Sequence, residues 1–263
     1  MLNFAKYHGL GNDFIFINNL AQNELLLTSR QCIDFCDRNF AIGADGVVFV
    51  QKSKSLDYKM TIINSDGTEA EMCGNATRCL AKYLGKLENI TQKNYSIETK
   101  AGKISPQLLL DGTVIVDMNT PKLQNVPCTL SFGDTLFGYK VFPVSMGNPH
   151  CVIFVDNFDF NWQQVGATIE TDAHFPAKTN VHFAKILDTK TVEVRVWERG
   201  AGETLACGTG ACAVAVTGIL ANKLQNQVLI KLAGGNLKIS WDGSLESSVF
   251  MTGPATKVFE GKI

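Results

Sequence analysis

The chain has 263 residues, of which 45% are hydrophobic, and it carries a formal net charge of −1. This length is ample for one large domain or two ordinary ones, and the balanced charge argues against a nucleic-acid or anionic-membrane partner, which would need a basic patch. The longest apolar runs, such as residues 211–216, are far too short to span a membrane, and the N-terminal segment MLNFAKYHGLGNDF lacks the features of a signal peptide. We therefore expect a soluble, cytoplasmic protein.

In chain order, alternating apolar segments predict strands over residues 2–7, 13–18, 46–50, 58–64, 95–100, 103–109, 113–118, 138–144, 151–155, 180–186, 191–198, 227–232, 236–241 and 247–252. Helices are predicted over residues 28–39, 74–86, 161–169 and 208–222. This order lacks the regular βαβ alternation of a Rossmann fold and predicts an α+β fold. The last helix, GTGACAVAVTGILAN, is apolar on nearly every side and must be surrounded. A mostly antiparallel sheet wrapped around a central helix satisfies that requirement.

Several motifs occur twice in the same order. The segment KMTIINSDGTEAEMCG (59–74) resembles VEVRVWERGAGETLACG (192–208), so that Asn64 and Glu198 each precede a cysteine by nine residues. Likewise LGNDFIFI (10–17) resembles MGNPHCVIFV (146–155), and IGADGVVFV (42–50) resembles KTNVHFAKI (178–186). The offsets of these matches are nearly equal, which indicates two similar halves joined near residues 117–122.

The chain contains eight cysteines, and their spacing argues for free thiols. A chain of this length does not depend on disulfides, no C-x-x-C pair occurs, and the four histidines are scattered, so that no zinc motif is present. Six of the thiols have flanking residues typical of packing, namely Cys32, Cys36, Cys79, Cys128, Cys151 and Cys212. We expect no metal.

Cys73 and Cys207 differ from the others because each precedes a glycine at the predicted start of a buried helix. The first N–H groups of a helix lack internal partners and carry partial positive charge, which should stabilise a thiolate and lower its pKa. The same amides suit a carboxylate, so that Gly74-Asn75 and Gly208-Thr209 are candidates for the two sides of a carboxylate site. Two equivalent thiols around one anion site suggest inversion of a stereocentre, with one thiolate as base and the other thiol as acid.

These motifs resemble the diaminopimelate epimerase family along essentially the whole chain. The resemblance is carried by HGLGNDF (8–14), IGADG (42–46), NSDGTEAEMCGNATRC (64–79), MGNPH (146–150), TNVHF (179–183) and WERGAGETLACGTGA (197–211). It implies an epimerase that needs no cofactor and interconverts LL- and meso-2,6-diaminoheptanedioate, in the synthesis of lysine and peptidoglycan precursors. It also implies two similar domains with the active site in the cleft between them. Residues 1–118 and a tail of about 254–263 would form one domain, and 119–253 the other.

By the same resemblance, Cys73 and Cys207 would be the catalytic acid–base pair, and His150 and Glu198 would adjust their protonation. The residues implied to bind substrate are Asn12, Asn64, Gly74, Asn75, Asn148, Asn180, Glu198, Arg199, Gly208 and Thr209. The implied partner is a diamino dicarboxylate, with a homodimer as a candidate assembly and no nucleic acid or membrane. Gly46 departs from the family pattern, because many members carry glutamine there.

Plainer interpretations of these residues remain open. Asn12 and Asn148 could only shape their Gly-Asn turns, the pair Glu198-Arg199 could be a solvated ion pair, and His150 alone could be structural. Among functions, the alternatives are a related racemase acting on proline or histidine, a non-catalytic carboxylate-binding protein, and a thiol redox protein. The charged pair Glu198-Arg199 favours a substrate with a second charged end.

Overall fold

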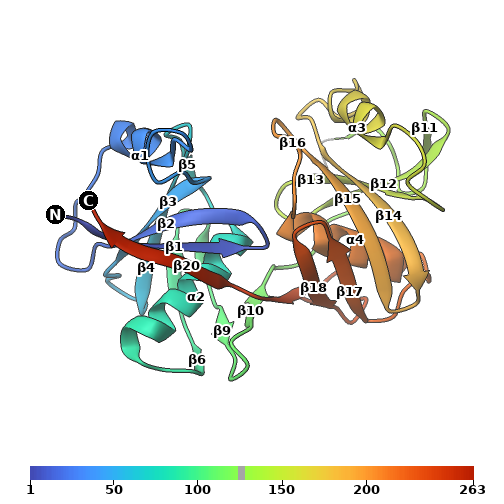
Figure 1. The fold of residues 1–263 in the computed structure, drawn as a ribbon. Coiled ribbons are helices and arrows are strands. Elements are labelled where there is room, and N and C mark those ends of the chain that lie inside the picture. The colour runs from blue at the N-terminus through green and yellow to red at the C-terminus, as the bar shows by residue number, and fades with distance from the viewer. Residues whose placement is uncertain (124–127) are drawn as a thin grey trace. The chain divides into compact units, whose positions relative to one another are not determined.

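The computed structural model describes residues 1–123 and 128–263, which divide into two compact units (Figure 1). Unit 1 consists of Met1–Val116 and Gly253–Ile263, and unit 2 consists of Asp117–Thr252. Within the described residues, no helix is both long and apolar enough to cross a membrane.

Unit 1 is built on a mixed sheet with the strand order β20-β1-β2-β3-β4-β7-β8, and β5 also pairs with β4. These strands are β1 (Asn3–Gly9), β2 (Asn12–Asn18), β3 (Gly46–Gln51), β4 (Tyr58–Asn64), β5 (Glu69–Ala70), β7 (Ile97–Thr99), β8 (Gly102–Ile104) and β20 (Thr256–Lys262). The pairs β2–β3 and β4–β7 are parallel, and the other pairs are antiparallel. Beyond this sheet, β6 (Lys93–Asn94), β9 (Gln107–Leu108) and β10 (Val114–Asp117) form an antiparallel ribbon.

A helix packs on each face of the unit 1 sheet. Successive residues of a strand point to opposite faces, so that Ile15 and Ile17 join the core under α1 (Ser29–Cys36) while Phe16 stacks on Tyr83 of α2 (Gly74–Glu88). The helix α2 contacts β1, β2 and the returning strand β20. Both faces of the central strands are therefore buried, which accounts for the continuous apolar run of β3.

Unit 2 is built on a second mixed sheet, whose strands follow the order β11-β12-β13-β14-β15-β17-β18-β19, with β16 paired to β15. These strands are β11 (Thr135–Leu136), β12 (Tyr139–Ser145), β13 (Pro149–Phe154), β14 (Asn180–Asp188), β15 (Thr191–Glu198), β16 (Gly202–Glu203), β17 (Gln227–Leu232), β18 (Gly235–Ser240) and β19 (Phe250–Gly253). The helix α4 (Gly208–Leu220) packs on β12, β13, β14, β17 and β18, and α3 (Trp162–Glu170) packs on β14 and β15. Eleven residues of α4 are buried, as its sequence predicts for a surrounded helix.

The pairing order of the first sheet recurs in the second. The strands β1, β2, β3, β4, β5, β7 and β8 of unit 1 correspond in order and in direction of pairing to β12, β13, β14, β15, β16, β17 and β18 of unit 2. In each unit a helix begins shortly after the short fifth strand of this series, α2 in unit 1 and α4 in unit 2. The predicted fold, an α+β protein with a mostly antiparallel sheet and a central helix in each half, is confirmed, and each sheet includes two parallel strand pairs.

All four predicted helices are present. The two-residue strands β5, β6, β11 and β16 were not predicted, and two further differences concern longer segments. The segment 103–109, predicted as one strand, is split into β8 and β9, because Pro106 lies between them and has no N–H to donate to a ladder. The strand β20 was not predicted from its pattern. Its residues are mostly half-buried or exposed, so TKVFEGK lacks a strong apolar alternation.

Candidate active site

Cys73 and Cys207 occupy equivalent positions at the starts of the two central helices. Each is the residue immediately before its helix, with an extended backbone and no side-chain cap bond. Gly74 and Gly208 are the first helical residues, and both are buried. The free N–H groups of each first turn therefore lie beside a thiol, as the sequence predicted.

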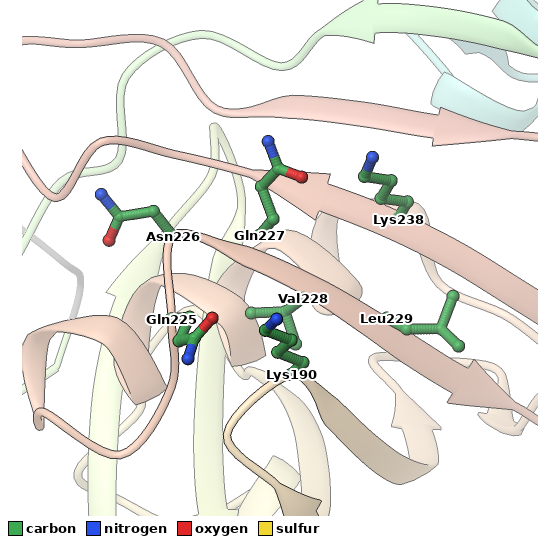
Figure 2. Close-up of a pocket in the computed structure, with 7 residues that line it drawn as sticks. All are labelled: Lys190, Gln225, Asn226, Gln227, Val228, Leu229 and Lys238. Atoms are coloured by element: carbon green, nitrogen blue, oxygen red, sulfur yellow. The ribbon is translucent and has the colours of Figure 1, made fainter.

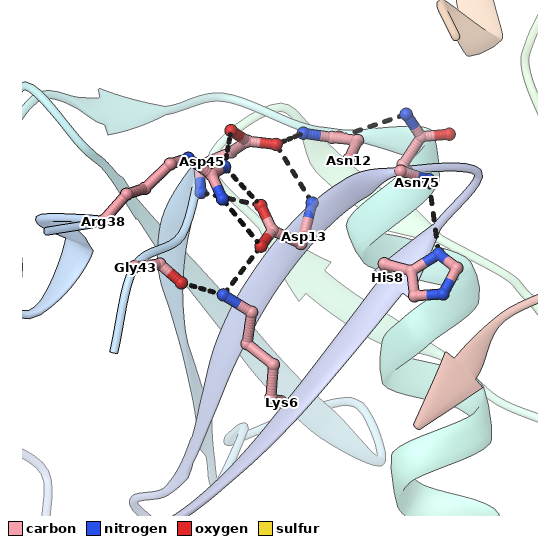
Figure 3. A network of polar contacts seen from close by, with 9 residues as sticks. Lys6, His8, Asn12, Asp13, Arg38, Gly43, Asp45 and Asn75 are labelled. Carbon is pink, nitrogen blue, oxygen red and sulfur yellow. Dashed lines mark hydrogen bonds and ion pairs between the residues drawn. The ribbon is translucent and has the colours of Figure 1, made fainter. Parts of the chain in front are cut away.

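In unit 1 the thiol of Cys73 faces the side chain of Asn12. The Cys73 Sγ donates to Asn12 Oδ1 at 3.6 Å, and Asn75 Nδ2 donates to the same oxygen at 3.1 Å. On its other side, Asn12 Nδ2 donates to Asp45 Oδ2 at 2.6 Å (Figure 3). Because a carboxylate can only accept, Asp45 determines which end of the Asn12 amide faces the sulfur.

Asp45 belongs to a larger charged network at the same end of the sheet (Figure 3). Arg38 Nη2 lies 2.7 Å from Asp45 Oδ1 and 2.7 Å from Asp13 Oδ1. Lys6 Nζ lies 2.7 Å from Asp13 Oδ2 and also donates to the carbonyl of Gly43. Burial alone would raise the pKa of Asp13, but hydrogen bonds from Arg38 and Lys6 hold the pKa of this carboxyl below its usual range.

Asn75 and Asn64 have partners within unit 1. Asn75 is buried in the first turn of α2, and its Oδ1 accepts from Arg78 Nη2 at 2.9 Å. Asn64 ends β4, and its Nδ2 donates to Thr68 Oγ1 at 3.1 Å across the turn that follows. Asn64 lies opposite Gly46 of β3, so it comes to the same end of the sheet as Asp45.

In unit 2 the thiol of Cys207 is buried, and its pKa differs from the expected direction. Its Sγ lies 3.5 Å from Thr209 Oγ1. Burial raises the pKa of Cys207 well above its ordinary value, and the nearby carboxylate of Glu198 raises it further. The expectation of a lowered pKa is therefore wrong for Cys207, because loss of hydration and an adjacent negative charge outweigh the helix amides. Cys207 is held as a neutral thiol.

Two neutral histidines lie beside this thiol. His150 Nε2 is 2.9 Å from Asn148 Oδ1, and His150 Nδ1 is 2.9 Å from His182 Nε2. Burial is the main cause that lowers the pKa of His150 well below its ordinary value, and the neighbouring His182 is the second cause. Burial also lowers the pKa of His182 to about 3. Since an amide oxygen only accepts, His150 donates from Nε2 to Asn148 and accepts at Nδ1 from His182.

Asn180 and Arg199 bond mainly to backbone. Asn180 Nδ2 donates to the carbonyl of Pro149 at 2.8 Å, and its Oδ1 accepts from Arg199 N at 3.1 Å. Arg199 Nη1 donates to the carbonyl of Ala177 at 3.0 Å. Glu198 Oε1 accepts from Thr204 Oγ1 at 2.6 Å. The bond between Asn180 and Arg199 joins the start of β14 to the end of β15. Substrate binding by Asn180, Glu198 and Arg199 stays a prediction.

The structure thus forms two residue groups, one in each unit. Around Cys73 it gathers Asn12, Asn64, Gly74 and Asn75, and around Cys207 it gathers Asn148, His150, Glu198, Gly208 and Thr209. Asp45 and His182 were not predicted from the sequence. Each lies in a motif that was quoted, IGADG and TNVHF, and a polar residue beside a strand end was the available signal.

One set of donors in unit 2 could hold a metal ion. His150, His182 and Cys207 are buried, and one potential ligand atom from each lies within 4.8 Å of the others. Spacing in the sequence gave no hint of this set, because its members come from two strands and a helix start. Two imidazoles and a thiol are donors that suit zinc.

A surface hollow of about 410 Å³ lies elsewhere in unit 2 (Figure 2). It is lined by Lys190, Gln225, Asn226, Gln227, Val228, Leu229 and Lys238. None of the predicted site residues lines it, so it is separate from both residue groups.

Comparison of the sequence with known proteins gives one consistent result. The family model described as "Diaminopimelate epimerase" matches residues 4–124 and 142–258. A diaminopimelate epimerase from Trichodesmium erythraeum is 48% identical over 274 residues, covering 99% of this chain and 98% of that protein. One from Acaryochloris marina is 49% identical over 275 residues, covering 98% of this chain and 97% of that protein.

Solved structures with the same fold are more distant in sequence. A phenazine biosynthesis protein of the PhzF family from Bacillus anthracis has a TM-score of 0.76 at 17% identity, covering 100% of this chain and 98% of that one. A hydroxyproline epimerase from Agrobacterium vitis has a TM-score of 0.71 at 13% identity, covering 99% and 91%. At these identities the likeness concerns the fold alone.

Proposed function

Because the chain belongs to the diaminopimelate epimerase family, an isomerase family of lysine biosynthesis, we propose that Cys73 and Cys207 are the two acid–base residues of its reaction. The observation that carries this proposal is the equivalent position of the two cysteines in the two units. Each thiol directly precedes the central helix of its unit, beside amides that have no partner within the helix. The six other cysteines hold no such position: Cys32, Cys36, Cys79 and Cys212 lie within helices, Cys151 lies within a strand, and Cys128 precedes a two-residue strand rather than a helix.

In the proposed reaction the two sulfurs act on opposite sides of one α-carbon. A thiolate removes the α-proton, and the electron pair of the broken C–H bond is left on carbon. The other thiol then gives its proton to the opposite face, so that the stereocentre is inverted and the two cysteines have exchanged protonation states. The reverse direction uses the same groups in exchanged roles, and no cofactor takes part.

The carboxylate of the reacting centre is proposed to bind the two helix starts. Gly74 and Asn75 would supply the amides on one side, and Gly208 and Thr209 those on the other. These donors would also stabilise the negative charge that spreads onto the carboxylate as the proton leaves.

The distant amino-acid end of the substrate is proposed to bind the asparagines and the charged pair. Glu198 would hold the ammonium group and Arg199 the second carboxylate, with Asn12, Asn64, Asn148 and Asn180 as further hydrogen-bond partners. Glu198 also adjusts the protonation of Cys207 in this proposal, supported by its effect on the pKa of that thiol. His150, neutral and near Cys207, would adjust it without contributing a charge.

The test replaces each thiol and follows α-proton exchange in heavy water. Cys73→Ala and Cys207→Ala should each lower inversion of LL-diaminopimelate by roughly 100- to 10,000-fold, the range of acid–base catalysis, without unfolding the protein. Cys128→Ala is the matched control, because Cys128 is only half-buried and bonds Leu130 N. Normal turnover by the Cys73 variant would refute the two-thiol mechanism, and inversion of free proline would refute the assigned substrate.

We also propose a homodimer, which is supported by the outer edge of the unit 1 sheet. The strand β20 pairs with β1 on one side, and in the described part of the chain its other edge carries no strand. Val258 is 54% exposed there and Phe259 is 44% exposed. An open strand edge that exposes apolar side chains favours pairing with a second chain.

Light scattering tests this assembly. Val258→Asp should convert a dimer into monomers, whereas Leu110→Asp, at a 73% exposed leucine outside this sheet, should not. A wild-type protein that is monomeric at all concentrations would contradict the proposal.

A further inference from the structure

The donor cluster of unit 2 is built from rigid elements. His150 lies in β13 and His182 in the adjacent parallel strand β14, and Cys207 directly precedes α4. Gly210 lets the imidazole of His182 lie against the first turn of that helix, because a Cβ at this position would stand 2.1 Å from the His182 Cε1. The three donors are therefore held together by the fold and not by flexible loops.

The hydrogen bonds of His150 leave the correct nitrogen facing the cluster. Asn148 Oδ1 accepts from Nε2 at 2.9 Å, so the lone pair of His150 is on Nδ1, the atom that faces His182. An imidazole that donates its second nitrogen to an oxygen acceptor is the usual arrangement of a histidine ligand to a metal. Asn148 thus already holds the His150 ring in the orientation that a metal ligand needs.

His182 is only partly satisfied in its buried position. Its side chain is completely buried, and its Nδ1 has no hydrogen-bond partner among the described residues. His182 thus has an incomplete set of hydrogen bonds beside the thiol of Cys207. Two charges act on the cluster: the carboxylate of Glu198 raises the pKa of Cys207, and the guanidinium of Arg199 contributes to the lowered pKa of His150.

We propose that His150, His182 and Cys207 form a binding site for a zinc-class divalent cation, and that its occupation inactivates the enzyme reversibly. The metal would bind His150 Nδ1, His182 Nε2 and the sulfur of Cys207. The thiol proton is released to solvent, and the His182 proton moves from Nε2 to Nδ1; no group is oxidised or reduced. The thiolate, tied to the metal, can then neither accept nor donate the substrate proton.

The same geometry limits the affinity of the site. Only three protein donors are brought together, and the transferred proton on His182 Nδ1 would have no acceptor among the described residues. The site is therefore suited to reversible inhibition and differs from a closed four-ligand structural zinc site.

Cobalt(II) is the probe for the test, because its bond to a thiolate gives a charge-transfer absorption that does not depend on enzyme activity. Titration of the wild-type protein should produce this band with a stoichiometry of one, and zinc should displace it. Cys207→Ser and His182→Asn should each weaken binding at least tenfold. Cys73→Ala is the matched control, and its band should be unchanged because Cys73 is not one of the three donors.

Activity measurements complete the test on the wild-type enzyme. Zinc should inhibit inversion at the concentration that displaces cobalt, and a chelator should restore the full rate. The proposal is overturned if Cys207→Ser retains the band, if Cys73→Ala loses it, or if inhibition persists after chelation. The two binding outcomes do not depend on whether the two-thiol mechanism is correct, because the binding measurements require no turnover.

Discussion

At the scale of single residues, the amide of Asn12 shows how a distant charge can reach a thiol that is proposed to be catalytic. Its Nδ2 is committed to Asp45, so its carbonyl oxygen is turned toward the thiol of Cys73. An acceptor at that place favours the protonated sulfur. Asp45 is thus a positioning residue, which acts on Cys73 through Asn12.

Replacing Asp45 by asparagine should release this orientation. The Asn12 amide could then turn its NH₂ group toward the sulfur, which favours the thiolate and lowers the pKa of Cys73. We expect kcat/KM to fall roughly tenfold, or about 1.4 kcal/mol, with the acidic limb of its pH profile moved to lower pH.

Arg38→Gln is the control for this variant, because it removes a charge from the same network but no contact to Asn12. It should leave the pH profile in place. A profile that is unchanged in Asp45→Asn would show that Asp45 has no more than a structural role.

The buried pair of Lys6 and Asp13 should determine part of the acid stability. Because the folded pKa of Asp13 lies below its ordinary value of 3.8, its contribution is complete above that pH and is lost as the pH falls through the folded pKa. Asp13→Asn should lower the free energy of unfolding by about 3–5 kcal/mol at pH 7, since it leaves the Lys6 ammonium buried without its partner. The free energy of unfolding of this variant should also depend less on pH in the acidic range.

Denaturant titration at several pH values measures this effect. Asp34→Asn, which breaks the exposed Arg30–Asp34 pair, is the control and should cost less than about 1 kcal/mol. Equal losses in the two variants would contradict the assignment of the acid limb to Asp13.

The candidate site could be predicted from the sequence only where its residues share a local pattern. Cys73 and Cys207 stand out because each is followed by glycine and an apolar helix, a relation visible within a few residues. The pKa of Cys207 was not predictable, since its burial and its proximity to Glu198 arise from tertiary packing. The contacts of Asp13 with Lys6 and Arg38 likewise join segments that no local periodicity relates.

At the scale of elements, the residue composition of a helix indicates how many of its sides are buried. The sequence of α4 is apolar on all sides, and the structure surrounds it with five strands of its unit. By contrast, the apolar alternation in the sequence of β20 is weak. This strand forms because the edge of β1 is available for pairing. Elements that bury both faces were therefore predicted, and edge elements were missed.

The first turn of α4 should not tolerate a side chain at Gly210. In Gly210→Ala the new methyl group would meet the buried ring of His182, and we expect a loss of about 1–3 kcal/mol from overpacking. Thermal unfolding measures the change, and the double variant with His182→Asn should recover part of it. An undiminished melting temperature would mean that the ring can move aside without cost.

At the scale of the whole molecule, the two units share one order of strand pairing but differ in continuity. Unit 2 is a single stretch of chain, whereas unit 1 is completed by Gly253–Ile263. In unit 1, β20 pairs with β1 from Asn3 to His8, and Arg78 Nε donates to the carbonyl of Pro254 at 3.2 Å. The boundaries expected from the sequence, 118 and 254, stay a prediction about domains.

Deleting residues 256–263 should therefore destabilise unit 1 selectively. Hydrogen exchange should show amides of β1 and β2 losing protection, because β1 becomes an open edge, while those of β13, β14 and β15 keep it. Uniform loss of protection in both units would contradict independent stability of unit 2.

The return of the last strand also has a consequence for biosynthesis. All residues of unit 2 must leave the ribosome before β20 can reach its place beside β1, so the first unit to begin folding is the last to finish. During that interval the β1 edge is exposed on the nascent chain, and it is the surface that a chaperone would have to cover.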